Sequence, residues 1–97
     1  MKIDAIVIQE VDNVATALRD IQANEKVRLG LGEQIKEFLV RDPIDYGHKF
    51  AVANIREGEE IFKYGEVIGR ATRFIPCGGH AHIQNIESLR GRGDLVQ

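Results

Sequence analysis

The feature that most constrains this 97-residue chain is an internal repeat. Residues 17–27 align without gaps on residues 51–61, with the shared pattern Ala-x-x-Asp/Asn-Ile-x-x-Gly/Asn-Glu-x-Val/Ile, and residues 71–81 form a weaker third copy. The turn position holds asparagine or glycine in each copy: Asn24, Gly58 and Gly78. Both residue types adopt a positive φ at low cost, as a tight turn between two strands requires. The repeat therefore predicts strand–turn–strand units in a compact, mainly β domain.

Two other segments are interpreted as strands. Residues 2–9 form a short run rich in β-branched side chains, which favours a strand. Residues 33–41 place apolar side chains among charges at a spacing that fits a helix nearly as well, and the surrounding context favours a strand. Between these segments, Asp12 and Asn13 predict a turn, because their side chains form hydrogen bonds with nearby backbone.

Length and composition restrict the class of protein. The chain is long enough for one domain, and 43% hydrophobic with 29% charged residues is typical of a globular one. A formal net charge of −2 excludes a broad basic surface, so we expect no nucleic-acid partner. No apolar run approaches the roughly 20 residues that cross a bilayer, and the first residues lack the apolar core of a signal peptide, so we expect no membrane association. A single cysteine favours a reducing, cytoplasmic location.

We expect the folded domain to span residues 1–87. Residues 88–97 are rich in glycine and charge, and are interpreted as an extended C-terminal tail. Such a tail is either disordered or docked on a partner chain, and the sequence leaves both readings open.

All three histidines lie in the second half of the chain. His48 stands between a glycine and Lys49, so a proton carrier is followed by a cation that suits a carboxylate. The alternative is a turn histidine whose ring bonds to a backbone carbonyl. On a strand, His80, His82 and Gln84 would share one face, because side chains alternate with a period of two.

This face predicts either a metal or proton-transfer site, or a plain polar surface. His80 and His82, with Cys77 from the preceding turn, offer three ligands for a divalent metal, although the spacing is not a recognised zinc pattern and no fourth ligand is apparent nearby. The thiol is the weakest of the three, since a cysteine beside glycines commonly fills a turn.

Two other polar segments are candidates for substrate binding. Lys63 and Tyr64 precede a glycine, so the ammonium group lies either in a cleft or in solvent at a hairpin turn. Asp12 and Asn13 offer a carboxylate and an amide that suit a hydroxylated ligand, although turns commonly carry these residues. The sequence contains no phosphate-binding loop, nucleophile elbow or metalloprotease helix, so no complete catalytic constellation is present.

Taken together, these segments resemble the SAF domain of the altronate and galactarate dehydratase family, over about residues 3 to 85. The matching segments occur in the family's order and spacing: Asp12-Asn13-Val14-Ala15, Gly47-His48-Lys49-Phe50-Ala51, Asn54-Ile55, Lys63-Tyr64-Gly65, Ile68-Gly69, and His82 with Asn85. The combination is specific, whereas each tripeptide alone is weak. The resemblance implies a β-clip, a small mainly β domain made of long bent hairpins.

The resemblance also implies a reaction, the removal of water from a polyhydroxy carboxylate to give a 2-keto-3-deoxy acid, usually with a divalent metal, often iron. Such an elimination needs a base near the α proton, an acid for the departing hydroxyl and a cation for the enolate. By resemblance, His48 and His82 are expected to transfer protons or contact the metal, Lys49 and Lys63 to bind the substrate carboxylate, and Asn85 to bind hydroxyls.

Two departures from the family pattern bear on these expectations. Relatives usually close the last segment with Val-His-x-His-Asn, whereas here Gln84 replaces the second histidine, and glutamine is a poor metal ligand. His80 compensates if it shares the face. The chain also ends at Gln97, where a fused dehydratase would continue into its main domain.

We therefore interpret the chain as a small subunit or an excised N-terminal domain of a lyase. Its expected partners are a large dehydratase subunit, which would hold most of the metal site, and a hydroxy-acid substrate such as altronate or galactarate. A homo-oligomer is left open. The alternatives are the small subunit of a sulfolactate sulfo-lyase, which releases sulfite, and a SAF module that binds without catalysing.

Overall fold

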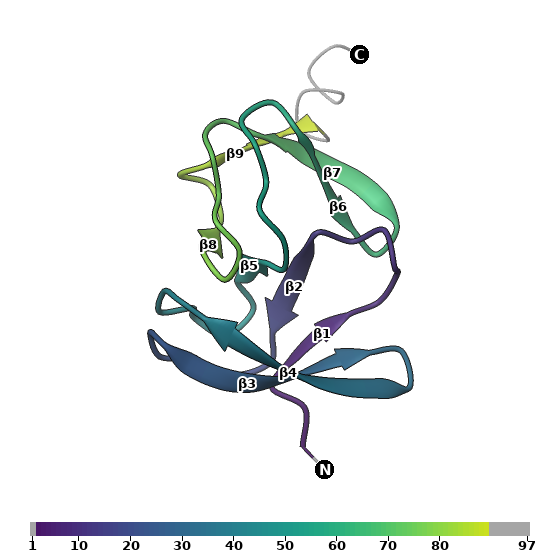
Figure 1. The fold of residues 1–97 in the computed structure, drawn as a ribbon. Coiled ribbons are helices and arrows are strands. Elements are labelled where there is room, and N and C mark those ends of the chain that lie inside the picture. Colours follow the sequence, from purple (N-terminus) through teal and green to yellow (C-terminus); the bar gives the residue numbers. More distant parts are fainter. Residues whose placement is uncertain (1, 90–97) are drawn as a thin grey trace.

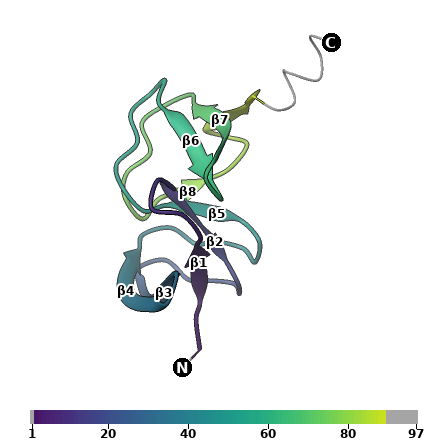
Figure 2. The ribbon, with the colours of Figure 1, turned by 90° about the vertical axis from the view of Figure 1, so that its right-hand side faces the viewer.

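A computed structural model describes residues 2–89 of the chain, and in this range the polypeptide forms short antiparallel hairpins around two adjoining sheets (Figures 1 and 2). The strands in chain order are β1 (Ala5–Val7), β2 (Val14–Ala17), β3 (Glu25–Leu31), β4 (Gln34–Val40), β5 (Lys49–Ala51), β6 (Glu60–Lys63), β7 (Glu66–Ala71), β8 (His80–Ala81) and β9 (Ile86–Ser88). The prediction of a mainly β domain with the β-clip fold is confirmed.

The larger sheet has six strands in the order β4-β3-β1-β2-β5-β8, and the smaller has the order β6-β7-β9. Only β1 and β3 pair in parallel; the other neighbours are antiparallel. In Figure 1 the β3–β4 hairpin lies at the end of the molecule near the N-terminus, and β6, β7 and β9 lie at the other end. No helix within residues 2–89 has the length and apolar character needed to cross a bilayer.

Both predicted strands are present, with different extents. The segment 33–41 is a strand and not a helix, because β4 pairs with β3 along its whole length, from Gln34 opposite Leu31 to Val40 opposite Glu25. The segment 2–9 contributes only the three residues of β1. Its strand ends early because the next two backbone N–H groups donate to the carboxylate of Asp12 and not to a neighbouring strand.

The turn positions of the repeat behave as predicted, and the structure adds a fourth copy, residues 40–50. The turn residues all have a positive φ: Asn24 (64°), Gly47 (84°), Gly58 (89°) and Gly78 (86°). The apolar positions are almost fully buried in every copy: Ala17, Ile21 and Val27; Val40, Ile44 and Phe50; Ala51, Ile55 and Ile61; Ala71, Ile75 and Ala81. The repeat therefore supplies most of the core.

The four copies pair two by two. Ile21 and Ile44 exchange backbone hydrogen bonds of 2.8 and 2.9 Å, and Ile55 and Ile75 exchange another such pair. Copies 17–27 and 40–50 build one hydrophobic cluster, around Phe50, and copies 51–61 and 71–81 build a second. Each pair thus buries apolar side chains that a single turn would leave in water.

The boundary of the predicted tail falls inside the sheet. Ser88, the first residue assigned to the tail, is the last residue of β9 and pairs with Gly69. The rest of the predicted tail, from residue 90 on, lies outside the described residues.

Candidate functional site

The three histidines meet where β5 and β8 pair. His48 is the residue before β5, His80 begins β8, and His82 follows it. Phe50 pairs with His80 and Lys49 with Ala81, so the two turns that carry the histidines are neighbours across the sheet. The strand pairing therefore joins segments that are 32 residues apart in the sequence.

In these two turns, unlike in the two other copies of the repeat, no glutamate side chain closes the turn. In copies 17–27 and 51–61 a glutamate, Glu25 or Glu59, accepts a hydrogen bond from the backbone N–H three residues earlier and closes its own turn. The equivalent positions in copies 40–50 and 71–81 hold His48 and Gly79. The histidine side chain is thus not used to close its turn, and its ring faces the other copy.

The three rings form one compact cluster. His48 Nδ1 lies 3.1 Å from His80 Nε2, and the His48 ring stacks on that of His82 with centroids 4.0 Å apart. One nitrogen from each ring lies within 4.8 Å of the others. His82 Nδ1 is buried and has no hydrogen-bond partner within residues 2–89. Buried polar atoms without a partner are rare, and a bound water, ion or ligand is one explanation for such an atom.

The surroundings of His80 and His82 favour the neutral form of these two rings. Burial lowers the pKa of His80 and of His82, and the nearby His48 lowers both pKa values further. A protonated ring would have to lose solvation and also face a neighbouring positive charge, so both effects act in the same direction. Neutral imidazole is the form that accepts a proton or coordinates a metal.

Lys49 adds a cation to the edge of this cluster. Burial lowers the pKa of its ammonium group, and the positive charge of Lys63 lowers the pKa further. Neither lysine forms an ion pair within the described part of the chain. Lys63 Nζ instead lies 5.0 Å from the centre of the Tyr64 ring, a cation–π contact. Two cations without a carboxylate partner are a suitable place for an anionic ligand.

An open cavity of about 200 Å³ adjoins the cluster. Its lining combines one histidine and one lysine of the site with three isoleucines and a serine: Lys49, Ile68, His82, Ile83, Ile86 and Ser88. Ile83 is 84% exposed at its edge. The cavity is thus a shallow pocket of mixed polar and apolar lining that is open at the surface.

Asp12 and Asn13, predicted to bind substrate, have a different environment. The Asp12 carboxylate accepts four backbone hydrogen bonds, including those from Tyr64 and Gly65 at 3.0 and 2.8 Å. The Asn13 side chain bonds to the backbone of β6 through both of its polar atoms. Both side chains connect the β1–β2 turn to the β6–β7 hairpin, so their geometry supports a structural role and gives no support to substrate binding.

Asn85, predicted to bind substrate hydroxyls, also bonds to backbone. Its Oδ1 accepts the N–H of His82 at 2.9 Å and its Nδ2 donates to the carbonyl of His80 at 2.8 Å. Asn85 is 7% exposed. It therefore fixes the turn that carries two of the histidines, and its polar atoms are already satisfied.

The remaining predicted ligand, Cys77, is not part of the cluster. Its backbone N–H donates to Asn54, and the thiol is absent from the set of nitrogen ligands that converge. His48 takes the third place instead. The sequence does contain a signal for this, because copy 40–50 of the repeat places His48 at the position of Gly79, next to His80, in copy 71–81.

Two polar side chains beside His80 were not predicted as its partners. Asp42 accepts the backbone N–H of His80 at 2.8 Å, and Gln84 Nε2 lies 2.9 Å from His80 Nδ1. Gln84 therefore contacts the histidine cluster through a hydrogen bond and not as a metal ligand.

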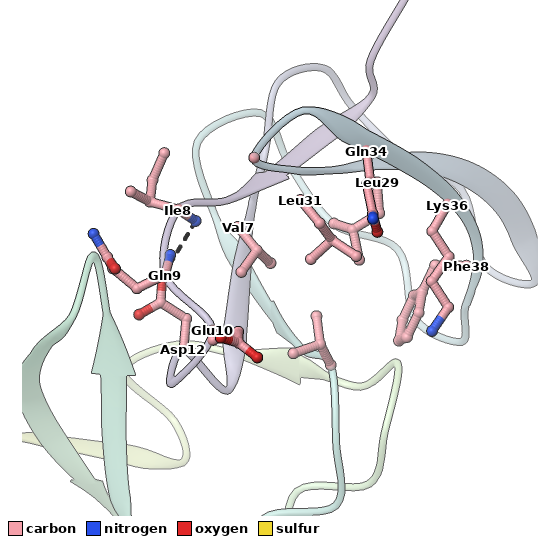
Figure 3. Close-up of a pocket in the computed structure, with 12 residues that line it drawn as sticks. Val7, Ile8, Gln9, Glu10, Asp12, Leu29, Leu31, Gln34, Lys36 and Phe38 are labelled. Carbon is pink, nitrogen blue, oxygen red and sulfur yellow. Dashed lines mark hydrogen bonds between the residues drawn. The ribbon is translucent and has the colours of Figure 1, made fainter.

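A larger cavity of about 620 Å³ lies away from the histidines, between β1 and the β3–β4 hairpin (Figure 3). Its floor is apolar, with Val7, Leu29, Leu31 and Phe38 pointing into it. Glu10, Gln34 and Lys36 lie around it, and no histidine or cysteine lines it. It lacks the converging acid–base groups of the cluster, so it is not the candidate site.

Comparison with known proteins gives a consistent assignment. The family model described as the altronate/galactarate dehydratase SAF domain matches residues 3–89. The altronate dehydratase of Bacillus subtilis (strain 168) is 42% identical over 83 residues, which cover 86% of this chain and 16% of that protein. The (2R)-sulfolactate sulfo-lyase subunit alpha of Chromohalobacter salexigens is 31% identical over 93 residues, covering 93% of this chain and 99% of that protein.

The altronate dehydratase of Escherichia coli (strain K12) is 36% identical over 80 residues, 82% of this chain and 15% of that protein. The chain thus spans about a sixth of the altronate dehydratases and nearly all of the sulfo-lyase subunit. The matched region contains all three histidines and both lysines of the site. The chain belongs to the family of altronate/galactarate dehydratase SAF domains.

Proposed function

We propose that this domain is the small component of a cytoplasmic lyase that removes water from a sugar acid such as altronate or galactarate, in a complex with a larger catalytic component. The observation that carries the proposal is the cluster of three histidines beside Lys49, a cation with no ion pair within residues 2–89. Acid–base groups and an anion-binding cation are what an elimination from a hydroxy acid needs. The remaining groups would come from the large component.

Each residue of the site has a stated part in this proposal. Lys49, with Lys63 behind it, binds the substrate carboxylate and withdraws charge from the α carbon. His48 and His82 transfer protons: one ring takes the α proton and the other donates a proton to the hydroxyl that leaves as water. The enol product then becomes the 2-keto-3-deoxy acid. The ring that takes the α proton must be neutral, and the lowered pKa of His82 supports that form at neutral pH, whereas the ring that donates must first carry an additional proton.

The residues present also fit a divalent metal. Imidazole nitrogens that share an ion at about 2.1 Å stand roughly 3.0–3.4 Å apart, and His48 Nδ1 and His80 Nε2 are 3.1 Å apart. The unpartnered His82 Nδ1 gives a second indication. His48, His80 and His82 would hold the ion, whose charge would stabilise the negative charge that develops on the substrate. A metal held mainly by the large component remains compatible with these residues.

A second candidate reaction is sulfite release from a sulfolactate. The observation that favours it is the similarity to the (2R)-sulfolactate sulfo-lyase subunit alpha of Chromohalobacter salexigens, which is 31% identical over 93 residues. The site would bind the same carboxylate and remove the same α proton, and only the leaving group would differ.

Reconstitution tests both reactions. The domain is mixed with a large component of the dehydratase type and, separately, of the sulfo-lyase type, and formation of the 2-keto-3-deoxy acid and release of sulfite are measured. We expect product only when both components are present. Full activity of the large component without this domain would contradict the proposal.

Variants of the cluster separate a catalytic domain from a module that only binds. His48→Ala and His82→Ala are expected to lower kcat by about 10²- to 10⁴-fold, the usual contribution of a general acid or base. Phe74→Ala is the matched control, since Phe74 is an exposed ring outside the cluster. Wild-type turnover in both histidine variants would favour the module without a catalytic role.

A further inference from the structure

Gln84 contacts the histidine cluster through its side-chain amide nitrogen, which can only donate a hydrogen bond. Its Nε2 lies 2.9 Å from His80 Nδ1. A side-chain amide nitrogen is a donor only, so His80 Nδ1 must accept and cannot carry a proton. The neutral ring of His80 then carries its proton on Nε2.

The position of this proton determines the next contact. His80 Nε2 lies 3.1 Å from His48 Nδ1. With the proton on His80 Nε2, His80 donates to His48, and His48 Nδ1 accepts. The neutral ring of His48 therefore carries its own proton on Nε2. A chain of hydrogen bonds runs in one direction, from Gln84 through His80 to His48.

We propose that Gln84 is a positioning residue that selects the Nε2–H tautomer of His80 and so sets the direction of proton sharing between His80 and His48. Combined with the proposed lyase reaction, on which this consequence rests, the neutral ring of His48 presents a donor N–H, and not a lone pair, to the substrate hydroxyl, and it can protonate that hydroxyl only after it has itself taken up a proton. His82 is then the ring left to take the α proton.

The proposal also predicts how the cluster responds to a metal. A metal at His80 Nε2 needs the lone pair of that nitrogen, and the selected tautomer has a proton there. Binding would require the His80 proton to move to Nδ1 and the Gln84 amide to present its oxygen instead. Gln84 therefore opposes metal binding at His80.

The other two polar side chains that contact His80, Asp42 and Asn85, bond to its backbone and not to its ring. Asp42 accepts the backbone N–H of His80, and Asn85 donates to its backbone carbonyl. These two contacts hold the main chain and do not touch the ring nitrogens. Gln84 is exposed, so replacing it removes a contact to the ring without opening a cavity in the core.

The test measures the tautomer directly in the metal-free chain. The ¹⁵N chemical shifts of the imidazole nitrogens, assigned by NMR at a pH where the rings are neutral, separate a protonated nitrogen from one with a lone pair. In the wild type we expect a lone pair on His80 Nδ1 and a proton on Nε2. In Gln84→Glu, whose carboxylate accepts and cannot donate, we expect both rings to change, with protons on Nδ1 of His80 and of His48.

Gln84→Leu should give a mixture of the two His80 tautomers, and the control Gln34→Leu, an exposed glutamine on β4, should keep the wild-type shifts. A proton on His80 Nδ1 in the wild type, or unchanged shifts in Gln84→Glu, would overturn the proposal. If Gln84→Leu does not fold, Gln84→Glu still decides the question, because it preserves the shape of the side chain.

Metal affinity gives a second readout that does not depend on catalysis. With Co²⁺ as the probe, followed by its absorption spectrum, Gln84→Glu is expected to bind about 10- to 100-fold more tightly, the range seen when the hydrogen-bond partner of a ligating histidine changes. Ile83→Glu places the same charge on the neighbouring exposed residue, away from His80 Nδ1, and controls for simple attraction.

Equal gains in Gln84→Glu and Ile83→Glu would attribute the effect to charge alone and contradict a role for the tautomer in metal binding. Neither measurement uses the lyase assay. An inactive reconstituted complex with the expected tautomers would therefore reject the proposed function and retain the role of Gln84, and the reverse result would do the opposite.

Discussion

Replacing Asp12 by alanine is expected to destabilise the fold by about 3 kcal/mol. Asp12 is 7% exposed, and its carboxylate accepts four backbone hydrogen bonds. Two of these come from Tyr64 and Gly65, more than fifty residues away, and tie the β6–β7 turn to the β1–β2 turn. Hydrogen bonds to a charged group are each worth about 1.5 kcal/mol or more, and the two local bonds are more easily replaced by water.

Urea unfolding measures this loss. With a slope of about 1–1.5 kcal/mol per M for a small domain, the midpoint of Asp12→Ala should fall by about 2–3 M. Asp12→Asn keeps one acceptor oxygen and should lose about half as much. Asp20→Ala is the matched control, because the Asp20 carboxylate accepts one exposed backbone bond, from Tyr46, and should cost less than about 1 kcal/mol.

A loss for Asp12→Ala no larger than for Asp20→Ala would refute this reasoning. The carboxylate would then have little structural value, and the sequence-based prediction that Asp12 binds substrate would regain support. A large loss of stability with unchanged KM in Asp12→Asn, measured in the reconstituted lyase, would instead confirm the structural role.

Three other outcomes follow from the structure. Lys49→Met removes a half-buried cation whose pKa is lowered by burial. The urea midpoint should therefore stay the same or rise, while KM for the hydroxy acid increases about tenfold or more. A lower midpoint with an unchanged KM would contradict this expectation. The pKa values of His80 and His82 in the folded chain lie below the ordinary 6.5, so the unfolded chain takes up protons first as the pH falls. The free energy of unfolding should therefore decrease from about pH 7 downward. A urea midpoint that is constant between about pH 7 and 5 would exclude this. Gly69→Ala should lower the free energy of unfolding by about 1–3 kcal/mol, because a Cβ there would stand 2.6 Å from the carbonyl oxygen of Glu87 and push β9 away; an unchanged melting temperature would show that β9 moves freely.

Much of the fold could be predicted because the repeat encodes local geometry. A positive φ at Asn24, Gly58 and Gly78 depends on residue type, and the structure has it at all three. Copy 40–50 is not apparent from residue identity, because Val40 replaces alanine and Phe50 replaces valine or isoleucine. The equivalent positions of the four copies share their burial, which can be observed only in the folded chain.

The strand at β4 shows a different limit. Its apolar spacing fitted a helix nearly as well as a strand, and only its pairing with β3 decides between them. Such pairing is a property of two segments at once, so a local pattern in one of them carries little information about it.

For the candidate site, too, one part could be predicted from the sequence and another part could not. The residue types were predictable: three histidines and two lysines that suit acid–base chemistry and a carboxylate. Their hydrogen-bond partners were not, since Asp12 and Asn85 have the same chemical groups whether they bind a substrate or a backbone amide. Only the packed chain shows that their polar atoms are already used.

The sequence by itself determined the turns, the mainly β class, the family and the chemical groups that the site contains. The tertiary structure alone decided that His48 joins His80 and His82, that Cys77 does not, and that the Gln84 amide contacts the His80 ring. The physical reason is one of range. Turn geometry depends on φ and ψ within a few residues, whereas a cluster depends on strand pairing that brings together residues distant along the chain.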